Sequence, residues 1–412
     1  MAETDYLTLT QALELLKVKP STLYSYVSRG EVRRIAQEDA RRSLYAKVDV
    51  QRLASRKRGP LAGAAAAAST MRWGEPVIQT GITCISRKGP IYRNRAAIDL
   101  ARSDTTFETV AQLMFTGLWR EDRAAWPAVS IPADMRALLG RRDAVTGADD
   151  IGNLLAMVTL ALGMHGRGAV EMDEGQGVAA ARLVILTLSG CMGFLSSSKR
   201  FIQRRPDESI AAYVLRSAGV AASPQAQRAI NGAMIVLADH ELAAATLTAR
   251  VAASTNASLF NCIAAAISCH VGFTVGTASN AVDTQVLDEI VRKKAIKARD
   301  LVRDYGDNRL GFNHPLYPDG DPRAEFILET SQALVPRKHP LSHVFPFLEA
   351  ARRSGAKPGV AFALAVLTRA LGMPAGSAAA LWILARSAGW VAHVLEQRSQ
   401  AFMMRPRARY IV

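Results

Sequence analysis

A histidine and an arginine share one short loop-like segment, which is the most specific motif in the chain. His314 lies in the Gly/Pro-rich stretch GFNHPLYPDGDPRA, and the Asp-Pro-Arg at its end supplies Arg323. A guanidinium matches a carboxylate with two parallel hydrogen bonds, and a histidine exchanges protons near neutral pH. Taken singly, such a residue is more often a solvated charge or a satisfied core side chain. The combination in one loop is hard to obtain by chance.

Metal and disulfide chemistry are not indicated. The four cysteines are widely spaced and form no CxxC pair, so the sequence predicts no metal site and no disulfide framework. This cysteine usage favours a reducing, cytoplasmic location. The polar N-terminus does not resemble a secretory signal. The most apolar run, Ala375–Leu395, carries Arg386 at its centre, which a bilayer would penalise by roughly 2.5–3.5 kcal/mol. We therefore expect no membrane span.

The bulk composition is that of a globular protein large enough for two or three domains. The chain has 412 residues, of which 49% are hydrophobic and 21% charged. The formal net charge is +15, and the basic excess is spread along the chain. This charge permits nucleic acid or anionic ligands as partners without demonstrating either.

The first 60 residues resemble a winged helix-turn-helix of the MerR or excisionase type. Thr8 can cap a helix to about Leu16, and after a turn at Lys17–Pro20, Ser21 can cap a second helix over Thr22–Arg29. In that family the second helix enters the DNA major groove. The residues that would then face DNA are Ser21, Thr22, Tyr24 and Arg29. A small docking module that binds no DNA is the competing interpretation.

The remaining elements predict a mainly α protein. Residues 61–70 are an Ala-rich linker, and beyond them apolar residues recur three and four apart. Ala226–Thr255 reads as one long helix, and Val360–Leu371 and Ser377–Gln397 as two more. Strand signals are limited to Val77–Ser86 and Ile91–Tyr92.

Four separated stretches resemble the citrate synthase family. They are Gly81–Gly117, Val236–Phe260 with its ADHEL, Gly311–Ala324 with the loop motif, and Leu367–Gln397, followed by RPRARY. Their order is that of the family, and together they span most of residues 71–412. The resemblance implies a helical fold with a large domain over 71–275 and 376–412, and a small domain over 276–375.

The resemblance also assigns roles to five residues. Arg323 and Arg386 match the arginines that bind the carboxylates of oxaloacetate, and Arg405 matches one that reaches into the partner subunit's site. His240 matches a histidine that contacts oxaloacetate, and His314 matches the one that donates to its ketone. The family needs no cofactor, with acyl-CoA as a possible co-substrate, and it works as a dimer.

Two family positions carry residues that cannot transfer a proton. The stretch GFTVGTAS places Val275 where the family has its enolising histidine, and PGVAFALAVLTRALG places Ala361 at its aspartate base. A general base is worth about 10²–10⁴-fold in rate, and an enolate donor about 10²–10³-fold. The nearest alternatives along the chain, His270 and Asp283, are separated from Val275 by more than one helical turn, so we expect them to point elsewhere.

Three functions therefore remain open. The chain is an impaired citrate synthase-like subunit that binds oxaloacetate or a similar 2-oxo dicarboxylate, as a homodimer or together with an active paralogue. Alternatively, it is a working acyl-CoA:oxaloacetate acyltransferase with altered catalytic residues. The third possibility is a ligand-sensing, DNA-binding regulator.

Overall fold

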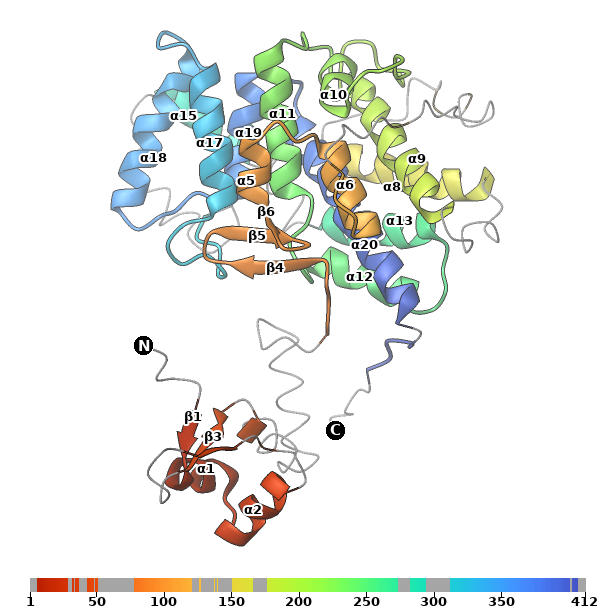
Figure 1. Cartoon of the computed structure of the whole chain (residues 1–412). Helices are drawn as coiled ribbons and strands as arrows, with labels where there is room; N and C mark the ends of the chain where they lie inside the picture. Colours follow the sequence, from red (N-terminus) through yellow and green to blue (C-terminus); the bar gives the residue numbers. More distant parts are fainter. Residues whose placement is uncertain are drawn as a thin grey trace, which may run out of the picture. The chain divides into compact units, whose positions relative to one another are not determined.

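The protein divides into two units, Met1–Gln79 and Thr80–Val412, which are described separately. The computed structural model (Figure 1) describes residues 6–28, 32, 34–36, 43–47, 49–50, 78–120, 126, 137, 139, 150–165, 176–272, 282–293, 312–400 and 402–406. The predicted boundary at residue 60 and the division into large and small domains remain predictions.

The first unit combines two short helices with a three-stranded antiparallel sheet. Its elements are β1 (Tyr6–Thr8), α1 (Leu9–Leu16), α2 (Pro20–Ser28), β2 (Arg34–Ala36) and β3 (Ser43–Ala46), with sheet order β1-β3-β2. Thr8 caps α1 in a capping box with Gln11, as predicted. A small core of Ala12, Leu16, Leu23, Val32, Tyr45 and Val50 holds the elements together.

The second helix of this unit starts earlier than predicted. Pro20 begins α2, because a proline has no N–H to leave unpaired in the first turn, so Ser21 lies inside the helix rather than at its cap. Ser21, Tyr24 and Ser25 are exposed, Thr22 is half-buried and Leu23 is buried. Arg29 lies outside the described residues. The helix-turn-helix assignment remains a prediction.

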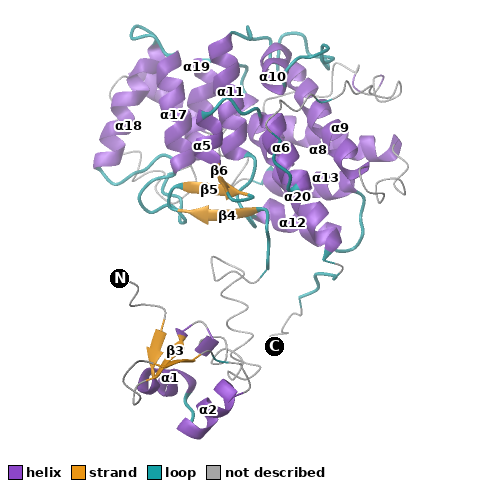
Figure 2. Ribbon diagram, viewed as in Figure 1, coloured by secondary structure: helices purple, strands orange, loops and turns teal. Residues whose placement is uncertain are grey.

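The second unit is a helical body with one small sheet, which confirms the mainly α prediction. Its strands are β4 (Thr83–Ser86), β5 (Gly89–Tyr92) and β6 (Arg95–Ala96), paired antiparallel in that order (Figure 2). The α-helices are α5 (Ala97–Arg102), α6 (Phe107–Thr116), α8 (Ile151–His165), α9 (Gln176–Cys191), α10 (Ile210–Ser217), α11 (Pro224–Leu237), α12 (Ala244–Ala253), α13 (Leu259–His270), α15 (Asp288–Lys293), α17 (Pro322–Leu334), α18 (Val344–Arg353), α19 (Val360–Ala370) and α20 (Ser377–Ser399). Short 3₁₀ helices at Met192–Phe194 and Pro340–His343 and a π-helix at Val282–Leu287 complete the body.

The prediction of one helix over Ala226–Thr255 is wrong. The structure breaks it into α11 and α12, with residues 238–243 between them. Buried Tyr92 occupies the break, because its hydroxyl lies 3.2 Å from the carbonyl oxygens of both Val236 and Asp239. Glu241 then adopts a left-handed conformation with φ of 54°, which no helix tolerates. His240 therefore sits on a loop instead of a helix face.

Helix α20 is the centre of this body. It packs against α6, α9, α11, α12, α13 and α19, and nearly all its residues are buried. Gly389 allows the α11–α12 loop to touch it, since a Cβ there would lie 2.3 Å from Asp239 Oδ1. The Gly389 N–H also donates to Ala238 O at 2.9 Å.

Among the described residues, two helical stretches are long and apolar enough to cross a membrane. They are Gly177–Phe194 and Ser377–Ser399, and 78% and 89% of their most apolar windows are buried inside the protein. The core helix of a globular protein gives the same pattern.

Candidate functional site

Four of the five residues singled out from the sequence come together in the second unit. His240 lies between α11 and α12, His314 precedes α17, Arg323 opens α17, and Arg386 is in the middle of α20. The His240 and His314 rings meet edge to face, with centroids 5.1 Å apart. Burial and then the charges of Arg323 and Arg386 lower the pKa of both histidines. We call this group the four-residue site.

The Asp-Pro-Arg motif has a local structural explanation. The Asp321 carboxylate accepts the Arg323 N–H and so caps α17, whose first residue is Pro322. The Arg323 side chain then folds back onto the same carboxylate, with Nε–Oδ1 at 3.0 Å and Nη2–Oδ2 at 2.7 Å. Burial opposes ionisation of Asp321, but Arg323 holds its pKa below the usual value. The motif fixes a buried guanidinium in one orientation.

The hydrogen bonds of His314 define which ring nitrogen carries its proton. The Leu316 N–H donates to His314 Nδ1 at 3.2 Å, so Nδ1 is the unprotonated nitrogen and Nε2 carries the hydrogen. Burial, reinforced by Arg323, lowers the His314 pKa to about 4. At neutral pH His314 is therefore a neutral imidazole with an Nε2–H to donate.

Arg386 is a buried cation that lacks an ion-pair partner among the described residues. Its side chain is 4% exposed and its Nε has no hydrogen-bond partner there. Burial lowers its pKa to about 10, so it stays charged at neutral pH. An unpaired buried guanidinium is costly. A carboxylate ligand would remove that cost.

Tyr317 and His270 belong to this region and were missed as site residues in the sequence. The Tyr317 hydroxyl lies 3.0 Å from His240 Nε2, and its ring lies 5.4 Å from the Arg323 guanidinium carbon. His270 packs between Trp382 and Trp390, with ring centroids at 5.1 and 5.6 Å. Tyr317 follows His314 within the same loop motif, and this nearness in sequence could have indicated it as a site residue. His270 was expected from the sequence to point elsewhere, but the packing of α13 on α20 brings it near Arg386.

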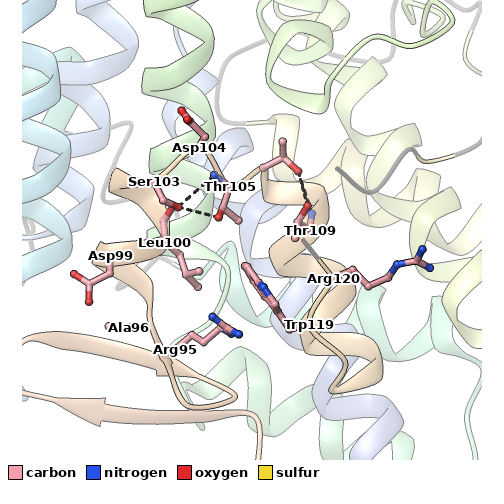
Figure 3. A pocket seen from close by; sticks show the side chains of 11 residues that line it. Arg95, Ala96, Asp99, Leu100, Ser103, Asp104, Thr105, Thr109, Trp119 and Arg120 are labelled. Atoms are coloured by element: carbon pink, nitrogen blue, oxygen red, sulfur yellow. Dashed lines mark hydrogen bonds between the residues drawn. The ribbon is translucent and has the colours of Figure 1, made fainter. Parts of the chain in front are cut away.

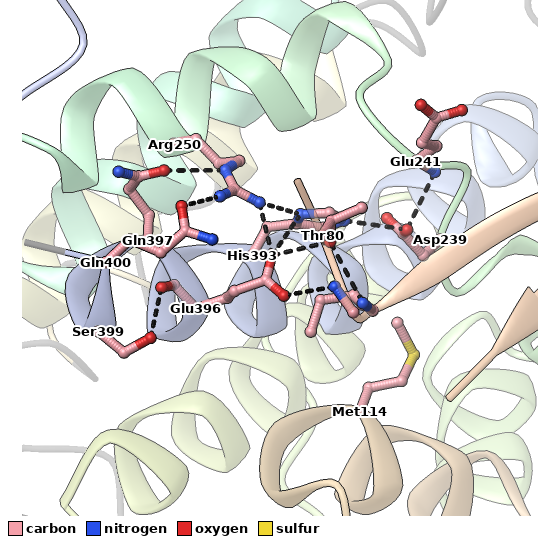
Figure 4. A network of polar contacts seen from close by, with 12 residues as sticks. Thr80, Met114, Asp239, Glu241, Arg250, His393, Glu396, Gln397, Ser399 and Gln400 are labelled. Carbon is pink, nitrogen blue, oxygen red and sulfur yellow. Dashed lines mark hydrogen bonds and ion pairs between the residues drawn. The ribbon is translucent and has the colours of Figure 1, made fainter. Parts of the chain in front are cut away.

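A polar network extends from this site through α20 (Figure 4). Buried Arg250 donates to Glu396 at 2.6 Å, Gln397 at 3.0 Å and Gln400 at 2.8 Å, and it faces His393 Nδ1 at 3.2 Å. His393 Nε2 lies 3.2 Å from Asp239 Oδ2. Glu396 also accepts from Thr80 Oγ1 and Gly81 N, both at 2.7 Å. The network thus joins α12, α20, the start of the second unit and the residue before His240.

The remaining assigned residues lie elsewhere or cannot be located. Ala361 is buried in the first turn of α19. The loop before His314 pairs with the residues before α19, through Asn313 N to Lys357 O at 2.8 Å. Arg405 is exposed on the C-terminal tail. Val275 lies outside the described residues, as does the Asp283 side chain.

A cleft near the start of the second unit contains none of these side chains (Figure 3). It has a volume of about 670 Å³ and is lined by β6, α5, α6 and the residues after α6. Arg95 stacks on Trp119 at 4.0 Å, while Asp99 and Asp104 add opposite charge. It offers no unpaired buried polar group, so its chemistry is less specific than that of the four-residue site.

Comparison with known proteins identifies the family. The family model "Citrate synthase, C-terminal domain" matches residues 70–407. The chain belongs to the citrate synthase family. The described helical body is thus a citrate synthase fold, as the motifs predicted.

Individual relatives within the citrate synthase family are distant. "Citrate synthase 2" of Bacillus subtilis is 32% identical over 218 residues, which are 51% of this chain and 58% of that protein. The match to the Saccharolobus solfataricus citrate synthase spans 51% of that protein, so the chain spans little more than half the length of these relatives. The 2-methylcitrate synthase of Shewanella oneidensis is 28% identical over 79% of this chain and 90% of its own length.

Solved citrate synthases share the fold. The Thermoplasma acidophilum enzyme, solved with carboxymethyl coenzyme A and oxaloacetate, superposes with a TM-score of 0.70 at 22% identity, covering 82% of this chain and 94% of that one. The Thermotoga maritima enzyme gives a TM-score of 0.66, also at 22% identity.

Proposed function

We propose that this protein binds oxaloacetate or a similar short 2-oxo dicarboxylate in the four-residue site, and that the isolated chain condenses it with acyl-CoA weakly or not at all. The observation that carries the proposal is the convergence of His240, His314, Arg323 and Arg386 from separate segments. The solved relative that holds oxaloacetate supports the ligand class.

Three of the four groups have separate tasks in binding the ligand. Arg386 takes one carboxylate with its unpaired guanidinium. Arg323, held in place by Asp321, presents its remaining N–H groups to the second carboxylate. The neutral His314 donates its Nε2–H to the ketone oxygen, which polarises the carbonyl carbon for attack.

The missing function is removal of a proton from the acyl-CoA methyl group. This step needs a base and a donor for the enolate oxygen. Ala361, buried in the first turn of α19, has only a methyl group as its side chain, and Val275 cannot carry a proton at any position. The carbon nucleophile would form slowly even with the ketone polarised.

A partner subunit is needed to balance the charge. Arg323 is neutralised by Asp321, and the Asp239 charge acts on Arg386. A dicarboxylate brings two more negative charges, so at least one further cation is required. The exposed Arg405 would supply it across a dimer. Helix α8 exposes Met157, Leu160 and Met164 along one face, which suits burial against a second subunit.

Calorimetry with oxaloacetate and a thiol-release assay with acetyl-CoA on one sample test the proposal. We expect binding without turnover, and no binding with Arg386→Leu. Hybrid dimers of Arg386→Leu with Arg405→Leu should recover binding, because one of their two sites is intact. If oxaloacetate does not bind the wild-type protein, the proposal fails. A separate experiment, copurification from the native host, distinguishes a homodimer from a pair with an active paralogue.

A working acyltransferase is the second candidate function. The carboxylate of Glu241 supports it. Glu241 is half-buried beside His240, and burial followed by the Asp239 charge raises its pKa, which suits a general base. The solved relative that holds carboxymethyl coenzyme A supports acyl-CoA as co-substrate. Release of CoA that Glu241→Gln abolishes would favour this function. Turnover unaffected by that change would exclude Glu241 as the base.

A DNA-binding regulator is the third candidate. The exposure of Ser21, Tyr24 and Ser25 on one face of α2 supports it. Two modules in a dimer predict half-sites about 10 bp apart or a multiple of that spacing. Binding to the upstream DNA of its own gene without sequence preference at physiological salt would exclude this function.

A further inference from the structure

The unpaired state of Arg386 needs an explanation, because a buried carboxylate lies within reach of it. Asp239 is fully buried, and its Oδ1 lies 2.3 Å from where a Cβ on Gly389 would be. Gly389 is one turn after Arg386 on α20, so their side-chain positions are about 5–6 Å apart. Arg386 Nε nevertheless lacks a hydrogen-bond partner among the described residues, and the side chain that approaches the Asp239 carboxylate from β4 is the hydroxyl of Thr83 instead.

Two groups contact the other oxygen of Asp239. The Glu241 N–H donates to Oδ2 at 3.0 Å, and His393 Nε2 lies 3.2 Å from the same atom. His393 Nδ1 faces Arg250 Nη1, which has only hydrogens to offer. Nδ1 must therefore be the acceptor, so Nε2 carries the hydrogen that is donated to Asp239. Arg250 thus fixes the tautomer of His393.

We propose that His393 is a positioning residue that tethers Asp239 and so keeps Arg386 unpaired for the incoming carboxylate. Without the tether, Asp239 would rotate toward the guanidinium and occupy the place of the ligand. Arg323 provides the contrast, since it has no such protection and is paired with Asp321 at 2.7 Å. The charges support this arrangement: burial opposes ionisation of Asp239, but His393 and Arg386 keep its pKa below the usual value.

The inference rests on the proposed function, and oxaloacetate calorimetry on four variants tests it. His393→Leu should weaken oxaloacetate binding by at least tenfold, because the released Asp239 pairs with Arg386. His393→Gln should stay within about threefold of wild type, since its amide can still accept from Arg250 and donate to Asp239. Exposed His343 provides the matched control, and His343→Leu should bind normally.

The deciding variant is the double substitution His393→Leu with Asp239→Asn. An asparagine cannot form an ion pair with Arg386, so this protein should regain wild-type affinity. A purely structural role for His393 predicts further loss instead. Thermal unfolding of each variant measures stability separately, and we expect the loss of affinity in His393→Leu without a matching loss of stability.

The outcomes separate this inference from the proposed function. If wild-type protein does not bind oxaloacetate, the proposed function fails. If wild-type protein binds oxaloacetate but His393→Leu binds it equally well, the proposed role of His393 is wrong. A weakened His393→Leu that Asp239→Asn does not repair also overturns it.

Discussion

The two halves of the site are equipped very differently. On the dicarboxylate side, Arg323, Arg386 and His240 are buried and His314 is half-buried, and Asp321, Tyr317 and the Asp239–His393 pair surround them. On the enolising side, the family position described by the structure is Ala361, and the other is Val275 by sequence. Under the proposed function, recognition of one substrate would thus be separable from activation of the other.

The sharpest test of this difference is to rebuild the enolising side. Val275→His with Ala361→Asp should raise CoA release by about 10²–10⁴-fold, the usual value of a general base. The thiol-release assay measures it, with His314→Ala in the rebuilt protein as the control that should abolish the gain. An unchanged rate would mean that the acyl-CoA half is defective in more than proton transfer.

Breaking the dicarboxylate side should have the next largest effect. Arg386→Leu removes the unpaired guanidinium, and loss of one partner in a buried charge pair costs about 2–5 kcal/mol in binding. Calorimetry should therefore show a loss of oxaloacetate affinity of at least thirtyfold. Arg102→Leu removes an exposed arginine paired with Glu329 and should leave affinity unchanged. Equal losses in both variants would argue against a specific site.

The contact between α20 and the His240 loop can be tested at Gly389. A Cβ there would lie 2.3 Å from Asp239 Oδ1 and 2.5 Å from Ala238 O, so Gly389→Ala should destabilise the protein by about 1–3 kcal/mol. Gly81→Ala, whose Cβ would meet nothing closer than 3.5 Å, is the matched control. Denaturant unfolding measures both. Equal stability of the two variants would mean that the loop does not need this close approach.

The buried histidines predict a pH dependence of stability. Burial lowers the pKa of His270 to about 3, from a usual value near 6.5. Between these values the unfolded chain binds a proton that the folded protein excludes, so stability falls as the pH drops. Each such histidine contributes a slope of about 1.4 kcal/mol per pH unit. His270→Leu should reduce the slope between pH 6 and 4 by that amount, and an unchanged slope would contradict the neutral, buried state.

Hydrophobic periodicity predicted the helical class, because it is a local pattern, whereas His240 and Arg386 were assigned to the site by the resemblance to the citrate synthase family. The loop motif indicated His314 and Arg323 together. Periodicity misled at Ala226–Thr255, since the break at Asp239–Glu241 is set by Tyr92, a residue more than 140 positions away. The Arg250–His393–Asp239 chain was not predictable for the same reason. Its members lie on separate elements, and no local pattern pairs them.

The Glu396 carboxylate anchors the first residues of the second unit through hydrogen bonds. Thr80 and Gly81 are held by the Glu396 carboxylate, which also holds Arg250. A pull on the chain ahead of Thr80 would load this carboxylate before any other contact that these residues make with α20. Strain there would pass through Arg250 to His393 and on to the residue that precedes His240.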